Sequence, residues 1–373
     1  MTTTLWPPTQ PRYLSGRVVS SWAAEGIPSL GRAIALHQLA SIMRLELWRG
    51  ETLLETPRTL TQPDPARPGA TWLVQQCVRD WLLEGNAIAK VTARDWYGAP
   101  SAWRWAPAYR WGIVDDGFSG AESYTLNGIT VPNDDVIHVQ RGADPLMPGR
   151  GVGIVEQYVR TLNVSTMQLD SEAEALSGGG VPSVAIITPQ TDPSQKDADA
   201  AGLAWDTAFG GPARKPGIFP SGTVVTPLSW SPTDAQMIEA RNMNATDIAN
   251  LTGLDKYWLN VDSGSHNYKS PGPMWLTLLK TPLEAMLQLF EDSWSAALTP
   301  RGQRVRFRRQ DLTSDDLETN VRTMAQGKAS GLYSHEEARD YLGMDPSGGN
   351  PTLGLTAAPA AATPAADMGG TAA

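Results

Sequence analysis

Apolar residues recur every three or four positions between Gly151 and Leu176, and this spacing predicts one long α-helix. At about 1.5 Å per residue, such a helix would be roughly 39 Å long. The run Ser177-Gly178-Gly179-Gly180 follows directly. Glycine adopts the left-handed conformations found at helix exits without Cβ strain, so we expect the helix to end there.

A second long helix is predicted from Ser231-Pro232 to Gly253. The residues between the two helices are predicted to form a strand, a helix and two further strands. These segments are Val184–Ile187, Asp192–Phe209, Gly217–Phe219 and Thr223–Leu228. A compact insert needs its two ends close together. The two long helices are therefore expected to lie antiparallel and to carry a small α/β lobe at their tip.

Short alternating segments dominate the chain before the first long helix. Strands are expected at Leu45–Trp48, Thr52–Leu54, Ala87–Ala93, Ser101–Trp105, Trp111–Val114, Ser123–Leu126, Ile129–Val131 and Val136–Val139. Helices are expected from Ser29, as N-cap, to Met43 and from Thr71 to Leu83. Turn residues such as Asn127-Gly128 predict antiparallel pairing, so the fold class is expected to be α+β.

Helices dominate the region after the second long helix. A polar loop, Val261–Pro271, precedes an apolar helix from Pro273 to Leu298, which Pro282 should kink near Leu278. The remaining elements are a basic strand at Arg301–Arg309 and helices at Ser314–Gly327 and Ser334–Leu342, the last with a capping box of Ser334 and Glu337. Residues 1–28 are expected to form an arm, and 346–373 a disordered tail.

Composition narrows the class of protein. The 373 residues contain no apolar run near 18 residues, so no membrane span is expected. The formal net charge of -9 argues against an ordinary nucleic-acid binder, although an acidic wall lets DNA pass without sticking. The single cysteine, Cys77, excludes an intrachain disulfide framework.

The sequence lacks the motifs of the common catalytic and cofactor sites. Gly327-Lys328-Ala329 has neither the upstream glycine nor the hydroxyl of a phosphate-binding loop. The four histidines, His37, His138, His266 and His335, show no metal-ligand spacing. His138 is expected to be a hydrogen-bonded core residue. We therefore expect no catalytic residue, no metal and no cofactor.

Two groups of charged residues have more than one interpretation. The acid pairs Asp115-Asp116, Asp134-Asp135 and Asp315-Asp316 could bind a metal, but each adjoins a turn or helix start where aspartate caps the backbone. The basic run contains Arg301, Arg304, Arg306, Arg308 and Arg309. It could contact phosphate or an acidic partner, or it could be a strand edge paired with acids of a neighbouring subunit.

Several short motifs follow one another in a fixed order. They are Gly85-Asn86-Ala87, Trp105-Ala106-Pro107, Val136-Ile137-His138, Gly151-x-Gly153, Val181-Pro182-Ser183, Ser231-Pro232-x-Asp234-x-Gln236, Glu239-x-Arg241, Ile248-Ala249, Ser334-x-Glu336-x-x-Arg339, Gly343-Met344 and Pro346. In this order, over roughly Ser29 to Gly349, the sequence resembles the portal proteins of tailed double-stranded DNA bacteriophages, in the family typical of long-tailed phages.

The resemblance implies an elongated portal subunit with named parts. These are an N-terminal arm (1–28), an α/β wing (29–148), stem helix 1 (149–177), an α/β clip (178–230), stem helix 2 (231–254), a tunnel loop (255–272), a kinked helix with a wing strand (273–312), a small helical crown (313–345) and a tail (346–373). The two stem helices would be antiparallel. Stem packing is assigned to Val155, Val159, Leu162, Leu169, Ile238 and Ile248.

The resemblance also implies a function without catalysis. About twelve copies would form a ring at the unique capsid vertex, a channel through which double-stranded DNA is packaged and ejected without sequence recognition. The DNA-facing residues of the tunnel loop would be Ser265, His266, Asn267, Tyr268 and Lys269. The implied partners are the major capsid protein, the terminase large subunit and a head–tail adaptor, in a virion assembled in the host cytoplasm.

Two alternatives stay open. One is a different adaptor ring at the head–tail junction, which should lack two long helices flanking an insert. The other is a hydrolase or transferase that uses an acid pair such as Asp134 and Asp135.

Overall fold

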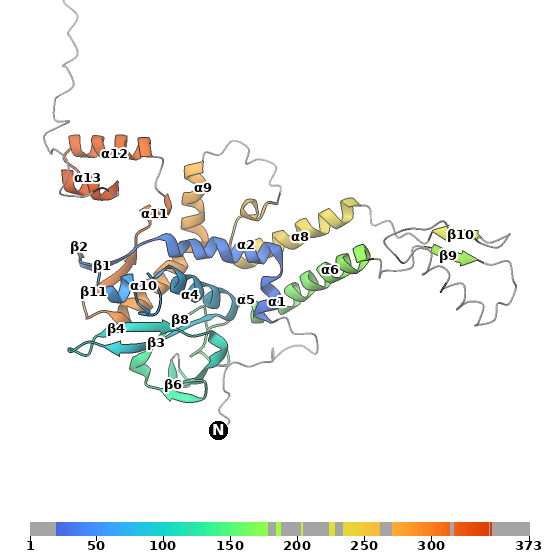
Figure 1. The fold of residues 1–373 in the computed structure, drawn as a ribbon, viewed down its shortest axis with the longest axis horizontal. Coiled ribbons are helices and arrows are strands. Elements are labelled where there is room, and N and C mark those ends of the chain that lie inside the picture. The colour runs from blue at the N-terminus through green and yellow to red at the C-terminus, as the bar shows by residue number, and fades with distance from the viewer. Residues whose placement is uncertain are drawn as a thin grey trace, which may run out of the picture.

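The computed structural model describes residues 20–118, 120–177, 184–187, 203, 224–227, 234–261, 271–313, 317–342 and 344. A body of helices and small sheets carries two long helices, α6 (Val159–Ser177) and α8 (Asp234–Thr252), which project from it side by side. Figure 1 shows both leading toward the strand pair of β9 (Val184–Ile187) and β10 (Val224–Pro227).

The other helices lie in the body or at its upper edge in Figure 1. They are α1 (Ser21–Glu25), α2 (Pro28–His37), α3 (Arg58–Thr61), α4 (Thr71–Glu84), α5 (Ile154–Gln157), α9 (Pro271–Leu278), α10 (Glu284–Leu298), α11 (Gln310–Thr313), α12 (Leu317–Ala329) and α13 (His335–Tyr341). Short 3-10 turns occur at Gln38–Ile42, Ala108–Arg110, Asn133–Asp135 and Lys256–Leu259.

The strands form four small antiparallel groups. Those of the body are β1 (Leu45–Arg49), β2 (Thr52–Leu54), β3 (Asn86–Arg94), β4 (Pro100–Trp105), β5 (Trp111–Asp115), β6 (Ala121–Leu126), β7 (Ile129–Val131), β8 (Val136–Gln140) and β11 (Gln303–Phe307). The sheet orders are β11-β1-β2, β4-β3-β8 and β5-β6-β7, with β9 and β10 as a separate pair. The basic strand β11 therefore returns, late in the chain, to the first hairpin.

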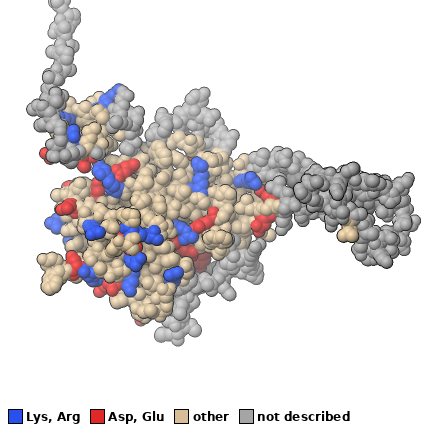
Figure 2. All heavy atoms as spheres, in the orientation of Figure 1, with Lys and Arg blue, Asp and Glu red and all other residues tan. Residues whose placement is uncertain are grey.

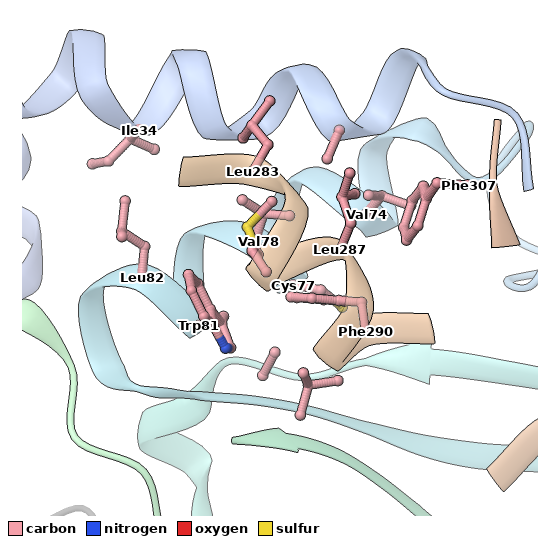
Figure 3. Packing of buried hydrophobic residues seen from close by; sticks show 14 of the residues in the cluster. Ile34, Val74, Cys77, Val78, Trp81, Leu82, Leu283, Leu287, Phe290 and Phe307 are labelled. Atoms are coloured by element: carbon pink, nitrogen blue, oxygen red, sulfur yellow. The ribbon is translucent and has the colours of Figure 1, made fainter. Parts of the chain in front are cut away.

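The core lies between α2, α4 and α10, above the sheet of β3 and β8. Figure 3 shows Val78 and Trp81 of α4 facing Leu287 and Phe290 of α10, with Ile34 of α2 close by. All five are buried. Full burial of one such side chain contributes about 1.5–3 kcal/mol, and this layer joins residues more than 200 positions apart in the sequence.

The α+β fold class is confirmed, and most predicted elements occur where the hydrophobic pattern places them. The hairpin of β1 and β2, the helix α4 with its Gly85 exit, and the strand β8 agree with prediction. So does the capping box of α13, where Ser334 Oγ accepts the Glu337 N–H at 3.1 Å. The strand pair of the insert also forms. Its predicted strand Gly217–Phe219 lies outside the described residues, as does its predicted helix Asp192–Phe209 except for Leu203, which is helical.

The prediction of one helix from Gly151 to Leu176 was wrong. The helical region begins at Ile154 and breaks at Tyr158, whose φ of -120° and ψ of 32° separate α5 from α6. Gly151 and Gly153 lie before the helix. The backbone of Gly151 is close to Gly85 and Arg141, and that of Gly153 is close to Leu83 and Glu84 at the end of α4. Apolar spacing is the same on both sides of Tyr158, so periodicity alone could not show the break.

The N-terminal boundary also needs correction. The predicted arm extends to residue 28, but α1 begins at Ser21, and Ala24 and Ile27 are buried in the core. The next helix begins with Pro28 at its first turn and Ile27 as N-cap, rather than with Ser29 as N-cap. Proline suits this position because the first helical N–H groups have no intrahelical acceptor.

The predicted kink at Pro282 takes the form of a π-helical turn at Leu279–Leu283, between α9 and α10. Proline lacks an N–H, and its ring clashes with the carbonyl four residues earlier in a regular helix. A local widening of the helix is one known way to accommodate this clash.

Candidate functional site: the helix pair and the arginine cluster

Polar contacts fix the register of the antiparallel helices α6 and α8. Ser165 Oγ donates to Asn244 Oδ1 at 2.6 Å, and Ser165 is buried. One to two turns further along, Arg241 Nε donates to Glu172 Oε2 at 2.9 Å. The Arg241 guanidinium lowers the pKa of Glu172, whose side chain is almost fully buried. From the first contact to the second, the residue number rises in α6 and falls in α8, which confirms that the two helices are antiparallel.

The residues assigned to stem packing lie mostly at the inner faces of this pair or at its base. Five of the six are buried or pack partly buried against the core: Val155, Val159, Leu162, Leu169 and Ile248. The sixth, Ile238, lies in α8, and its side chain is outside the described residues.

A tight junction joins the start of α5 to the sheet. Gly85 has φ of 78°, and its backbone lies so close to Val152 and Gly153 that a Cβ would overlap them. Asn86 Oδ1 accepts the N–H of Gly151 at 2.7 Å, and its amide donates to the Gly151 carbonyl at 3.0 Å. The motifs Gly85-Asn86-Ala87 and Gly151-x-Gly153 therefore meet at one place.

His138 belongs to the same junction. Its Nε2 lies 3.0 Å from Asn86 Oδ1, so this nitrogen donates, and Nδ1 accepts from the Tyr124 hydroxyl at 3.1 Å. Burial lowers the pKa of His138 to about 4 and raises that of Tyr124 to about 12. Both groups are thus neutral near pH 7, and both ring nitrogens are in use. The predicted hydrogen bonding of His138 is confirmed, but its side chain is half-buried rather than part of the core.

Arg150, which no sequence motif marks as functional, is fully buried beside this junction. Its Nε donates to Asp144 Oδ2 at 2.8 Å, and its Nη2 donates to both carboxylate oxygens of Glu156, at 2.6 and 2.8 Å. Glu156 lies in α5, so the buried guanidinium links the loop before the helix to the helix itself. The only available signal was an arginine between two glycines, Gly149 and Gly151.

Two members of the arginine cluster serve this chain's own structure. Arg309 Nη2 lies 2.9 Å from Glu284 Oε1, and Arg309 also pairs with Glu291, both in α10. Arg308 is mostly buried and lies 3.8 Å from Glu46 and 3.5 Å from Asp340 of α13. The acids in these pairs belong to the same subunit, so both arginines already have partners within this chain. Their expected contact with phosphate or a neighbouring subunit stays a prediction.

The other three arginines lie on the surface side of the sheet. The guanidinium carbon of Arg306 lies 5.2 Å from the centre of the Trp48 ring, a cation–π arrangement. Arg304 is opposite Trp48 in the register of β1 and β11, and it is exposed, as is Arg301 in the preceding turn. These two are the members of the cluster best placed to meet a partner.

The acid pairs cap turns. Asp115 Oδ1 accepts from Gly117 N–H, and Asp116 Oδ1 accepts from Phe118 N–H. Asp135 pairs with Arg94 at 2.8 Å, and the Arg94 guanidinium also donates to the Asp134 carbonyl. An open hollow lies beside this second pair, next to His138, Tyr124 and Ala297. Within the described residues, no three His, Cys, Asp or Glu side chains are grouped as a metal would require. The pair Asp315-Asp316 lies outside the described residues.

The residues assigned to DNA contact, Ser265 to Lys269, also lie outside the described residues. The segments on either side of them are described. Trp258, in the turn before, and Trp275, in α9, pack with ring centres 5.2 Å apart, and both rest against the core. This contact joins the turn at Lys256–Leu259 to α9.

Charge is mixed over the visible surface. On the face shown in Figure 2, basic and acidic residues alternate over the body without a broad basic area. No helix in the described ranges is both long enough and apolar enough to cross a membrane.

Comparisons with known proteins match this geometry. The family model described as "Phage portal protein" matches residues 41–343. No curated protein matches the sequence. Among solved structures, the fold is similar to that of an HK97 family phage portal protein from Corynebacterium diphtheriae, with 18% identity and a TM-score of 0.61 over 79% of this chain and 97% of that one.

Two further structures come from assembled particles. One is a chain in the virion of a native gene transfer agent particle, with 17% identity and a TM-score of 0.58 over 90% of this chain and 96% of that one. The other is a chain in the neck of a native particle of this kind computed with C12 symmetry, with 18% identity, a TM-score of 0.55, and coverage of 86% and 91%. These likenesses establish the fold. Because the family model spans well over half of the sequence, the chain belongs to the phage portal protein family.

Proposed function

We propose that about twelve copies of this chain form a ring at one capsid vertex and that double-stranded DNA passes through the ring during packaging and ejection. The observation that carries the proposal is the family match over residues 41–343, which includes both long helices and the insert between them. A different adaptor ring is expected to lack this arrangement. The structural role of the family favours a subunit without catalytic activity.

The copy number and location rest on similar folds in assembled particles. One similar chain is part of a neck computed with C12 symmetry, and another is part of a virion. This likeness supports a virion component, and we infer that the ring is assembled in the host cytoplasm. Copies related by rotation contact each other through two different faces, and twelve such contacts close a ring.

The parts of the subunit keep the names that the resemblance gives them. Residues 29–148 with β11 form the wing, α6 and α8 the stem, the insert the clip, and α12 with α13 the crown. The stem and clip would reach the motor side, where the terminase large subunit and later the head–tail adaptor dock. The wing, with exposed Arg301 and Arg304, would face the major capsid protein.

The proposed DNA contact is the segment containing Ser265, His266, Asn267, Tyr268 and Lys269. Support comes from the described residues on either side of it in the sequence, since Trp258 and Trp275 pack together against the core. Only Lys269, and His266 when protonated, would attract phosphate, which favours weak contact without sequence recognition.

An enzyme that uses an acid pair is the less favoured alternative. Asp135 is engaged by Arg94, and the nearest histidine, His138, has both nitrogens hydrogen-bonded. We expect neither the unmodified chain nor a variant with Asp134 and Asp135 replaced by alanine to show hydrolase or transferase activity. Loss of a hydrolase or transferase activity, with assembly unchanged, would favour the enzyme.

The experiment that tests the DNA role replaces His266 and Lys269 with alanine in particles assembled from otherwise normal components. The expected result is normal rings with fewer DNA-filled particles, measured by nuclease-protected DNA per particle. Lys256→Ala is a matched control, since Lys256 is an exposed lysine in the described turn before the segment. Unchanged DNA content in the double variant would remove these residues from the channel.

A further inference from the structure

Three large apolar side chains of the helix pair are exposed. In α6, Val164 is 65% and Met167 63% exposed, and in α8, Met243 is 65% exposed. Apolar residues on a long projecting helix usually mark a surface that is covered in the assembled state. They are not needed for the contact between α6 and α8, which Ser165, Asn244 and their neighbours make.

The helical repeat places these residues on the two outer faces of the pair. At 3.6 residues per turn, Met167 lies about 200° around α6 from Ser165, which faces α8. Met243 similarly lies about 200° around α8 from Arg241, which faces α6. Each helix therefore has an apolar position pointing directly away from its partner. The pair has two different outer surfaces, as a ring of identical copies requires.

The two outer faces carry opposite charges near the base of the pair. The α6 face has Arg160 beside Val164, and the α8 face has Asp247 beside Met243. Arg160 and Asp247 are exposed, and within the described part of the chain neither forms an ion pair. Further from the body, the α6 face carries exposed Asp170, about one turn from Met167, and the α8 face carries exposed Glu239. The charge complementarity between the two faces is therefore local to Arg160 and Asp247.

The alignment of α6 with α8 along their axes determines which residues of two neighbouring copies lie at the same height in a ring. Ser165 is level with Asn244. Counting along the antiparallel helices from that contact brings Met167 level with Met243 to within one residue. It brings Arg160 within two residues, about 3 Å, of Asp247. Rotation about a ring axis parallel to the helices keeps these levels, so they hold between copies as well as within one.

We propose that in the ring the outer face of α6 packs against the outer face of α8 of the next copy. Met167 then lies beside Met243 of that copy, and Arg160 pairs with its Asp247. This inference rests on the proposed ring and adds which surfaces close it. A radial arrangement of the two helices is disfavoured, because it would leave Met167 or Met243 facing water in the channel or outside.

Cross-linking tests the proposal. A chain with both Met167→Cys and Met243→Cys is assembled, treated with a short bis-maleimide and run on a denaturing gel. The expected result is a ladder of covalent oligomers up to the full ring. The two cysteines are on opposite sides of one helix pair, so the ladder reports contacts between copies. Each single variant is a control that should give no ladder, since Cys77 is buried.

Native mass and particle images of the same sample separate failure of this inference from failure of the proposed function. Intact rings without a ladder would overturn the α6–α8 contact and leave the ring standing. Absence of rings for the unmodified chain would overturn the proposed function, and this inference with it.

Charge reversal supplies an independent readout that does not depend on a cross-linker. Arg160→Glu and Asp247→Arg should each lower the fraction of chain found in rings, and the double variant should restore it. Both sites are exposed, so neither change is expected to prevent folding. Single reversals that assemble as well as the unmodified chain would contradict the proposed pair.

Discussion

The hydroxyl of Ser165 in α6 lies 2.6 Å from Oδ1 of Asn244 in α8, a residue 79 positions later in the sequence. Ser165 is buried, so this contact cannot be replaced by water without moving the helices. Together with Glu172 and Arg241, it fixes how the two helices align and which faces they leave outward.

Leu162, in the same helix as Ser165, packs α6 against the core. It is fully buried, and Leu162→Ala should lower the free energy of unfolding by about 2–5 kcal/mol. Leu162→Asp should also prevent rings, because it puts an unpaired charge into the core. Leu146→Ala is the control, since Leu146 is mostly exposed and should change stability by less than about 0.5 kcal/mol. Equal midpoints for both alanine variants in urea unfolding would contradict the packing of α6.

Gly85 is predicted to be intolerant of a side chain for two reasons. Gly85→Ala would strain a φ of 78° and would also drive Cβ into Val152 and Gly153, at a total cost of at least about 3 kcal/mol. Gly98 provides a matched control, since it has φ of 80° but open space around it, and Gly98→Ala should cost about 1 kcal/mol. Similar losses in thermal unfolding would mean that the junction is not closely packed.

Glu172 should contribute to stability at neutral pH and lose that contribution in acid. Its pKa is lowered in the folded state by Arg241, from an ordinary value of 4.5. The stabilisation is therefore present above that value and is lost as pH falls through the folded-state pKa. Glu172→Gln should cost about 1 kcal/mol at neutral pH and less in acid. Urea midpoints measured against pH check this, and a constant difference between variant and unmodified chain would argue against the ion pair.

Asp80 should make the folded state less stable as pH rises, which is opposite in sign to the contribution of Glu172 and occurs over a higher pH range. Burial raises its pKa from 3.8 to about 7, although Trp105 and Ala108 donate to its carboxylate. Its protonated form is favoured in the folded state, so stability falls as pH rises from about 4 to about 7 and then levels off. Asp80→Asn should remove this slope. A variant with the same pH profile as the unmodified chain would place the titration elsewhere.

Trp96 and Trp103 are seven positions apart in the sequence, but their replacement by alanine should change the free energy of unfolding by very different amounts. Trp96 is 94% exposed at the tip of the β3–β4 turn, whereas Trp103 is fully buried. Trp96→Ala should leave the free energy of unfolding within about 0.5 kcal/mol of the unmodified chain. Trp103→Ala should lower it by about 3–5 kcal/mol. Chemical unfolding of both variants checks the placement of this hairpin, and a large loss for Trp96→Ala would show that the turn is covered.

Hydrophobic spacing was sufficient to predict most helices and strands, because burial of one face repeats at a fixed period. It predicted α4 to within one residue at each end, and both long helices as a flanking pair. It could not show the break at Tyr158. Nor could it show the close approach of Gly153 to Gly85, because contacts between distant parts of the chain leave no periodic signal.

The partners of charged residues were harder to predict than the elements that carry them. Arg308 and Arg309 looked available in a basic strand, but Glu291 and Asp340, 18 and 32 positions away from Arg309 and Arg308, occupy them. The role of Arg150 depends on Asp144 and Glu156 meeting around it in three dimensions. The motif order, by contrast, was informative, because Gly85-Asn86 and Gly151-x-Gly153 proved to be two halves of one junction.

We propose that this chain is the subunit of a ring around an open channel. Native mass spectrometry of the purified chain, with images of the same particles, measures the copy number and the shape together. The expected result is a single species of about twelve copies with a central opening. A compact monomer or dimer under all assembly conditions would contradict it.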